Sequence, residues 1–258
     1  MGRTLLVTLS GTALLATVAV APTASAATSA CDIGPAIANT RVLATSPIIA
    51  GKVDSGVVVE TTVSTPAECR EVTQVLISAA SPDADNGTGT ANTTADLVSG
   101  DDHNGVYRAA LRVDNNTSAG LYNVSVSARD FYDKRTTAFN AASYTVVRST
   151  SVALRAKSYA VKRNTAVTLT GTLSRTAHDP DDVDPTVLPA AGEAVSIYTA
   201  ASKSSKQWKP VGQAITTRTG SFTIKAKVGK LAAFKAVYEG SDTLARSSSS
   251  AFLVTVTR

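Results

Sequence analysis

Histidine, cysteine and tryptophan are scarce in this chain, and with them the side chains from which many catalytic and metal sites are built. Its 258 residues include two histidines, two cysteines and one tryptophan. The sequence contains no G-x-S-x-G, H-E-x-x-H or P-loop motif. His103 and His178 fall in separate acidic segments, and neither has a nucleophile and an orienting group nearby in the sequence. We therefore predict that the chain is not an enzyme.

Aromatic residues and long apolar runs are also scarce. Aromatics make up 5% of the chain, which is little for a protein that would stack nucleic-acid bases. Beyond residue 26, no apolar run approaches the roughly 18 residues of a membrane-spanning helix. We predict that the mature chain binds no nucleic acid and has no membrane span.

The first 26 residues have the three parts of a secretory signal peptide. Arg3 supplies a positive charge, Leu5–Ala21 forms an uncharged apolar segment, and Ala24–Ala26 offers small residues for cleavage. We predict cleavage after Ala26 and a secreted protein, either free outside the cell or associated non-covalently with the wall. The alternatives are an anchor that stays attached and a lipoprotein modified at Cys31.

The only two cysteines are Cys31 and Cys69. An even number of cysteines in an exported chain is typical of disulfide bonding, so we predict one bond between them. Two free thiols or a metal-binding pair are the alternatives. A metal site would need further ligands, and the chain has few histidines to offer.

Charge divides the remaining chain into two halves. Residues 31–148 contain nine Lys and Arg against thirteen Asp and Glu, a net charge of −4. Residues 149–258 contain fifteen against seven, a net charge of +8. A single domain would rarely segregate charge so cleanly along its sequence. We therefore predict an N-terminal segment over 27–38, an acidic domain over 39–148 and a basic domain over 151–258.

Apolar residues recur at every second position in both halves, which is the period of a strand with one buried face. The pattern predicts strands at 57–63, 107–113, 122–128, 142–147, 167–173, 195–197, 222–228, 234–238 and 252–256. No segment after the signal peptide has the pattern of a convincing helix. About seven short strands in ~110 residues is typical of an antiparallel sandwich. We predict an all-β protein of two such sandwiches in tandem, with little interface between them.

Five stretches of the second half carry a family resemblance: Val167–Leu173, Ala191–Ile197, Trp208–Gly212, Thr219–Phe222 and Tyr238–Ser241. Together they resemble the bacterial immunoglobulin-like repeats of secreted and surface proteins of actinobacteria. The first half resembles the same superfamily more faintly, through Asn104–Tyr107 and Ala119–Tyr122. The resemblance implies a module for display, spacing or binding, and it brings no catalytic residues.

Within this resemblance, Tyr122 is placed like the tyrosine corner of immunoglobulin-like domains. The first half departs from antibody-type domains because it has no tryptophan and because Cys31 precedes the first strand. The disulfide is therefore expected to hold the N-terminal segment against the loop between the second and third strands.

Two acidic segments are candidates for calcium binding. The first contains Asp83 and Asp85, with Asp101–His103 downstream, and the second contains Asp179, Asp181, Asp182 and Asp184. Calcium takes about six to eight oxygen ligands, which clustered aspartates can supply. Neither segment has the spacing of an EF-hand loop. Solvated acidic loops are the alternative, and no other cofactor is expected.

The basic half offers a second candidate site, for a polyanion. Lysines flank the single tryptophan and alternate with core residues on neighbouring strands, which makes them face solvent. The candidate residues are Lys206, Trp208, Lys209, Lys225, Lys227 and Lys235, with Lys203 and Lys230 close by in the sequence. If the lysines share a face, it would attract an anionic polymer such as that of a cell wall. The alternatives are a packed tryptophan, lysines that protect strand edges and lysines that only confer solubility.

These observations favour a non-catalytic, secreted immunoglobulin-like protein at the cell envelope or outside the cell. Its partner would be an anionic wall polymer or an extracellular protein. A calcium-stabilised rod, an accessory or recruiting partner of an extracellular enzyme, and an enzyme of unrecognised type are the alternatives.

Overall fold

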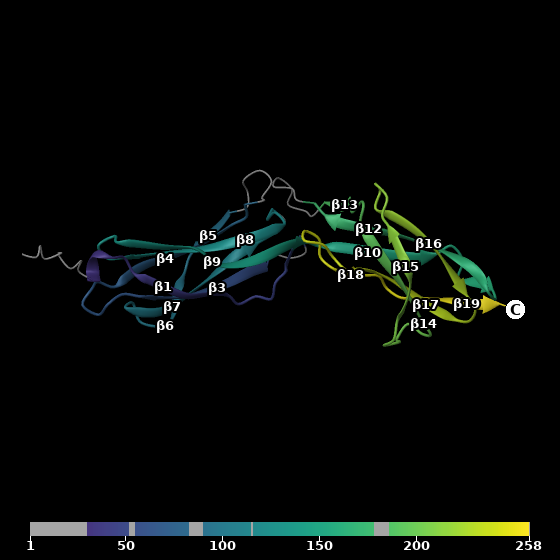
Figure 1. Ribbon diagram of the computed structural model, residues 1–258, viewed down its shortest axis with the longest axis horizontal. Coiled ribbons are helices and arrows are strands. Elements are labelled where there is room, and N and C mark those ends of the chain that lie inside the picture. The colour runs from purple at the N-terminus through teal and green to yellow at the C-terminus, as the bar shows by residue number, and fades with distance from the viewer. Residues whose placement is uncertain (1–29, 52–54, 83–89, 115, 178–185, 258) are drawn as a thin grey trace, which may run out of the picture.

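The computed structural model describes residues 30–51, 55–82, 90–114, 116–177 and 186–257. Several residues discussed above lie outside these ranges: the expected signal peptide, Asp83, Asp85, His178, Asp179, Asp181, Asp182 and Asp184. The described chain forms two β-sandwiches placed end to end (Figure 1). Its one helical element is the single 3₁₀ turn η1 (Ala30–Asp32). No helix in this part is long and apolar enough to cross a membrane.

The first domain packs a four-stranded sheet on a five-stranded sheet. The first sheet has the order β1 (Ala36–Val42), β3 (Ser55–Ser64), β7 (Asn104–Val113) and β6 (Asp96–Gly100). The second has the order β2 (Ile48–Ala50), β9 (Arg135–Arg148), β8 (Gly120–Asp130), β4 (Val72–Ala80) and β5 (Thr90–Thr94). If the strands are lettered in chain order, the first sheet is the A-B-E-D sheet of an immunoglobulin-like sandwich, and β9, β8 and β4 form its G-F-C sheet.

The second domain repeats this plan. One sheet has the order β10 (Thr150–Ala156), β12 (Thr165–Thr176) and β16 (Ser221–Val228), with β13 (Val187–Pro189) on the end of β12. The other has the order β11 (Ala160–Lys162), β19 (Phe252–Thr257), β17 (Ala232–Tyr238), β14 (Ala194–Ala200) and β15 (Lys209–Ile215), with β18 (Ser247–Ser248) on β17. Two immunoglobulin-like sandwiches in tandem are thus confirmed.

Each domain has its own core, built from the positions that the period of two predicts to face inward. In the first core, Tyr122 and Tyr144 stack with ring centroids 5.2 Å apart. Leu169, Ile197 and Phe234 are fully buried in the second core. The two clusters share no residue, so each sandwich buries its apolar surface independently of the other.

Two strand pairings are parallel, which corrects the expectation of purely antiparallel sheets. β2 runs parallel to β9, and β11 runs parallel to β19. In each domain the first strand is divided: β1 and β10 pair in one sheet, and the chain then crosses to the other sheet as β2 and β11. There it lies beside the last strand and runs in the same direction.

The tyrosine corner that the resemblance implies is present. The Tyr122 hydroxyl donates a 3.0 Å hydrogen bond to the carbonyl oxygen of Ser118, four residues upstream, and both residues are buried. In the second domain the Tyr238 hydroxyl donates instead to the Glu193 carboxylate, at 2.8 Å. Burial raises the pKa of Tyr238 to about 12, so this hydroxyl remains a donor at physiological pH.

The join between the domains has no linker and is more tightly bonded than the sequence suggests. β9 ends at Arg148 and β10 begins at Thr150, which leaves Ser149 alone between them. The Ser149 N–H donates to Ala50 of the first domain, and its carbonyl accepts from the N–H of Thr176 in the second, each at 3.0 Å. The backbones of the two domains are therefore hydrogen-bonded through the residue that joins them.

The expected domain boundaries also move. β1 begins at Ala36, so the last part of the expected N-terminal segment 27–38 belongs to the first sandwich. The second sandwich starts at Thr150, one residue earlier than the expected range 151–258. The first edge was hidden because β1 has no clear alternation of buried and exposed residues.

Candidate functional site

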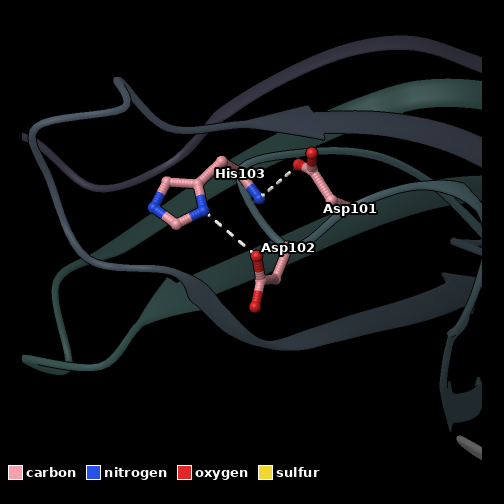
Figure 2. A group of neighbouring side chains, drawn as sticks. All are labelled: Asp101, Asp102 and His103. Carbon is pink, nitrogen blue, oxygen red and sulfur yellow. Dashed lines mark hydrogen bonds and ion pairs between the residues drawn. The ribbon is translucent and has the colours of Figure 1, made fainter.

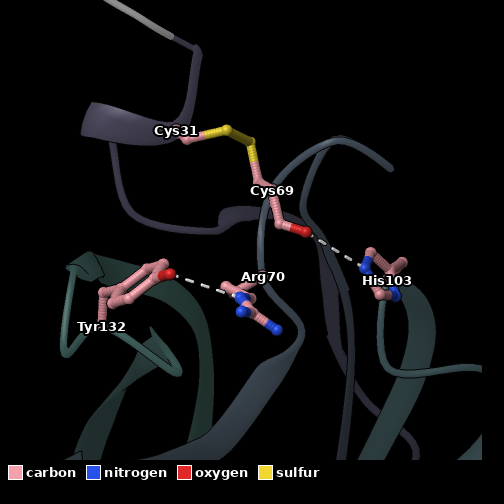
Figure 3. The surroundings of a disulfide bond; sticks show 5 residues. All are labelled: Cys31, Cys69, Arg70, His103 and Tyr132. Atoms are coloured by element: carbon pink, nitrogen blue, oxygen red, sulfur yellow. Dashed lines mark hydrogen bonds between the residues drawn. A yellow bond between two sulfur atoms is a disulfide. The ribbon is translucent and has the colours of Figure 1, made fainter.

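The disulfide joins η1 to the loop between β3 and β4 (Figure 3), and η1 lies at the end of the first domain away from the second domain (Figure 1). Cys31 in η1 is bonded to Cys69, and their Cα atoms are 5.2 Å apart. This confirms the predicted pairing. The loop it reaches lies between β3 and β4, the third and fourth strands, because the divided first strand adds one element to the count.

The turn that carries His103 packs against this disulfide loop. The Cys69 carbonyl oxygen lies 3.3 Å from Nε2 of His103, and the Asp102 carboxylate lies 3.0 Å from Nδ1 (Figures 2 and 3). Both neighbours only accept hydrogen bonds, so the arrangement favours the doubly protonated ring. The bond to Asp102 is the main cause that raises the pKa of His103, against the effect of burial.

The raised pKa gives a pH-dependent stability. Because the protonated ring is favoured in the folded state, its stabilisation is complete below the ordinary pKa of about 6.5 and is lost as the pH rises through the higher folded value. We expect His103→Asn to reduce the free energy of unfolding more at pH 5.5 than at pH 8.5, measured by urea unfolding. An equal loss at both pH values would contradict this account.

The same turn holds the one described cluster of possible metal ligands. Ligand atoms of Asp101, Asp102 and His103 lie within 4.8 Å of one another. However, Asp101 Oδ1 already accepts the backbone N–H groups of His103 and Asn104, at 2.9 and 2.8 Å. These bonds lower the pKa of Asp101 and account for the position of its carboxylate. Two exposed carboxylates are too few for the coordination that calcium prefers, and the second acidic segment lies outside the described residues.

An exposed aromatic pair lies at the same end of the molecule. Phe131 and Tyr132, in the turn between β8 and β9, are 59% and 62% exposed. The Arg70 guanidinium lies 5.5 Å and 5.7 Å from their ring centroids, and its Nε donates to the Tyr132 hydroxyl at 3.4 Å. The sequence analysis did not identify this group, because nothing in the local pattern brings Arg70 to that turn.

A polar pocket of about 520 Å³ opens in the first domain, beside the buried tyrosine pair. Its one carboxylate, Asp114, accepts hydrogen bonds from Asn116 N–H and Thr117 Oγ1 within the same turn. Arg112 lies 3.5 Å from the same carboxylate. The charged groups of this pocket are therefore occupied with one another.

The lysines grouped in the sequence analysis lie on strands of both sheets of the second domain. Lys225 and Lys227 lie on β16 in one sheet of the second domain, whereas Lys209 and Lys235 lie on β15 and β17 in the other. All of them except Lys235, which is half-buried, are exposed.

Trp208 is engaged within the domain. Its Nε1–H donates a 2.8 Å hydrogen bond to the Ser205 carbonyl, and Lys235 Nζ lies 4.5 Å from its ring centroid. A cation over the ring face is the geometry of a cation–π contact. This tryptophan is half-buried and packs on its own sheet, so it presents no open stacking platform.

Many exposed cations of the second domain gather at one end. The strand registers bring the 157–165, 201–208 and 229–231 connections to the end away from the join, where the C-terminus also lies (Figure 1). We call this the basic end, because it carries eight exposed cations: Lys157, Lys162, Arg163, Lys203, Lys206, Lys209, Lys227 and Lys230.

The acidic residues of the second domain that the structure describes all lie at the opposite end. Glu193 precedes β14 and bonds Tyr238, while Glu239 and Asp242 lie in the loop that contacts Arg148. Within the described ranges, none of the eight cations of the basic end forms an ion pair. The sequence analysis missed Lys157, Lys162 and Arg163, which reach this end only through the folding of β10, β11 and β12.

A pocket of about 370 Å³ opens within the basic end. Lys209, Lys227 and Lys230 line it together with the Gln207 side chain and apolar residues such as Val228. No acidic residue is among its lining residues. The pocket thus gathers three lysines around one concave surface without a carboxylate.

Comparisons with known proteins give fold-level similarity. No protein-family model and no curated protein matches the chain. A tetra-tandem repeat of a large adhesion protein matches 79% of this chain with 17% identity and a TM-score of 0.31, over 46% of its own length. The Escherichia coli adhesin FdeC matches 88% with 14% identity and a TM-score of 0.38, over 65% of its own length.

The adhesin InvE of Yersinia pseudotuberculosis matches 85% of the chain with 15% identity and a TM-score of 0.30, over 59% of its own length. The chain thus spans from about half to about two thirds of these three structures. TM-scores this low carry no information on what the chain binds.

Proposed function

We propose that this chain is a non-catalytic binding and spacer module outside the cell, and that its basic end binds an anionic polymer of the cell envelope. The observation that carries the proposal is a cluster of exposed cations at one end of the second domain, apart from its described carboxylates. Eight exposed cations gather at its free end, while its described carboxylates lie at the join. The Cys31–Cys69 disulfide supports a location in an oxidising compartment.

The physical basis is long-range attraction between one charged surface and a repeating anion. Lysine side chains on exposed loops keep their charge in water and adapt to a flexible polymer without a fixed docking geometry. Such a surface raises the local concentration of polyanions, and salt screens the effect. The in-line arrangement of the two sandwiches would hold this end at a distance from the first domain (Figure 1).

The proposal is tested by measuring binding of the full chain to immobilised linear polyphosphate and to polyglutamate. Reversal of three cations of the basic end (K162E, K203E, K206E) should weaken binding by about a hundredfold or more, taking roughly 1 kcal/mol per charge near an anionic surface. The matched control reverses three exposed cations elsewhere on the same domain (R155E, R218E, R246E), and we expect it to retain most of the affinity.

Salt dependence gives an independent criterion. The screening length falls from about 10 Å at 0.1 M to about 3 Å at 1 M salt, so affinity should fall steeply over this range. Binding that persists at 1 M salt, or that the two triple variants weaken equally, would refute a role for the basic end.

A further inference from the structure

We infer that the pocket formed by Lys209, Lys227 and Lys230 is a phosphate-binding subsite, which takes up single phosphate groups of the polymer that the basic end attracts. This inference rests on the proposed function and adds a specific site and ligand group to it. It predicts a preference for phosphate polymers over carboxylate polymers, which net charge alone does not give.

The three lysines come from three different elements that meet at the seam between the sheets. Lys209 begins β15, Lys227 lies near the end of β16, and Lys230 lies in the turn from β16 to β17. β15 and β16 are edge strands of opposite sheets and lie close to each other. The pocket therefore opens where the sandwich is not closed by strand pairing.

The turn that carries Lys230 packs against Asn164 in the neighbouring turn. The Asn164 N–H donates to the Val228 carbonyl at 2.8 Å, and a Cβ on Gly229 would lie 3.1 Å from Asn164 Oδ1. A side chain at Gly229 would thus press on the neighbouring turn. This close approach positions the backbone between Lys227 and Lys230, so both lysines are placed at the pocket by a packed turn.

The donors of the pocket suit phosphate. Lysine acts as a compact charge with three donors and is a common phosphate ligand. A phosphate group offers three strong acceptor oxygens, one more than a carboxylate, so three lysines can engage it together. The pocket contains three lysines, no arginine and no acidic residue. In the described chain none of the three lysines is paired with a carboxylate.

The size of the pocket limits what it can accept. A volume of about 370 Å³ is at the lower end of the range of about 300–1,000 Å³ for small-ligand sites. It suits a phosphate group with part of its linking unit, and the apolar lining residues Val228 and Ala232 suit the carbon atoms of that unit. A folded protein surface would not enter it.

The test compares two neutralised variants of the full chain that lose the same charge from the same end. One is the pocket triple K209Q/K227Q/K230Q, and the other is the matched triple K157Q/K162Q/K203Q outside the pocket. Both are titrated with linear polyphosphate and with polyglutamate. We expect the pocket triple to lose about tenfold or more of its affinity for polyphosphate, and the matched triple to lose clearly less. For polyglutamate the two losses should be equal.

A second readout locates the binding. Trp208 is the only tryptophan, and its neighbours Gln207 and Lys209 line the pocket. Inorganic phosphate should therefore change the Trp208 fluorescence of the wild-type chain and of the matched triple, but not that of the pocket triple. Melting temperatures of all variants show whether the substitutions leave the fold intact.

The outcomes separate the two proposals. Equal losses of polyphosphate affinity in both triples, or no response of Trp208 to phosphate, would overturn the phosphate subsite and leave the basic end as a general polyanion surface. If the wild-type chain binds neither polymer, the proposed function fails and this inference fails with it.

Discussion

Removal of the Cys31–Cys69 disulfide is expected to lower the free energy of unfolding of the first domain by roughly 3–4 kcal/mol and to leave the second domain unchanged. The bond closes a loop of 38 residues, and in the chain-entropy description a loop of this length restricts the unfolded state by about that amount. The effect stays in the first domain because the two apolar cores share no residue.

The variant C31S/C69S tests this with a reporter in each domain. The single tryptophan, Trp208, lies in the second domain, so its fluorescence follows that domain alone. Circular dichroism follows the strands of both domains during the same urea titration. We expect the dichroism to show one transition moved to lower urea concentration, while the fluorescence transition stays in place. A fluorescence transition that moves equally would show that the domains unfold as one unit.

The period of two in the sequence predicted most of the core correctly because it depends only on local order along one strand. β7 and β8 alternate buried and exposed residues almost without interruption, as their sequences indicate. β4 was missed although Val75, Ile77 and Ala79 follow the same period and are buried. Short strands such as β2 and β11 carry too few residues to show any period.

The pairing partners of the strands were harder to predict from the sequence, because they depend on the path of the whole chain. The two parallel pairings arise from the divided first strand of each domain, and no local pattern marks where a strand changes sheets. The disulfide was predictable because two cysteines allow only one intramolecular pairing. The positions of Arg70 and His103 beside the disulfide loop were not predictable, since separate turns bring these residues there.

The residues of the candidate site could likewise be predicted only in part from the sequence. The sequence revealed that the second half is basic, and it placed Lys209 and Lys227 among the relevant residues. It did not reveal that the cations gather at one end, because that depends on which strand ends lie together. Lys225 lies two residues before Lys227 on β16, further from that end, and Lys235 covers Trp208.

A second large effect is expected at the join, where a substitution should change how the two domains move relative to each other. Gly51 lies at the join with φ of +89°, where residues with a side chain are strained. A Cβ at this position would lie 2.8 Å from Cβ and 3.2 Å from Cγ2 of Thr176 in the second domain. The close approach accompanies the hydrogen bonds by which Ser149 ties Ala50 to Thr176. Gly51 is therefore a position where the backbone of the first domain comes close to a side chain of the second domain.

We expect Gly51→Val to uncouple the domains, because the new side chain would force Thr176 and the paired backbone apart. In ¹⁵N relaxation measurements, amides of both domains in the wild-type chain should report one common overall tumbling. In the variant the two domains should give separate, shorter correlation times. Gly192→Val is the matched control: its φ is +77°, and nothing lies within 4 Å of a Cβ built there. It should strain the second domain but leave the tumbling common to both domains. Separate tumbling already in the wild-type chain would mean that the join does not hold the basic end at a fixed position, and the spacer part of the proposed function would then fail.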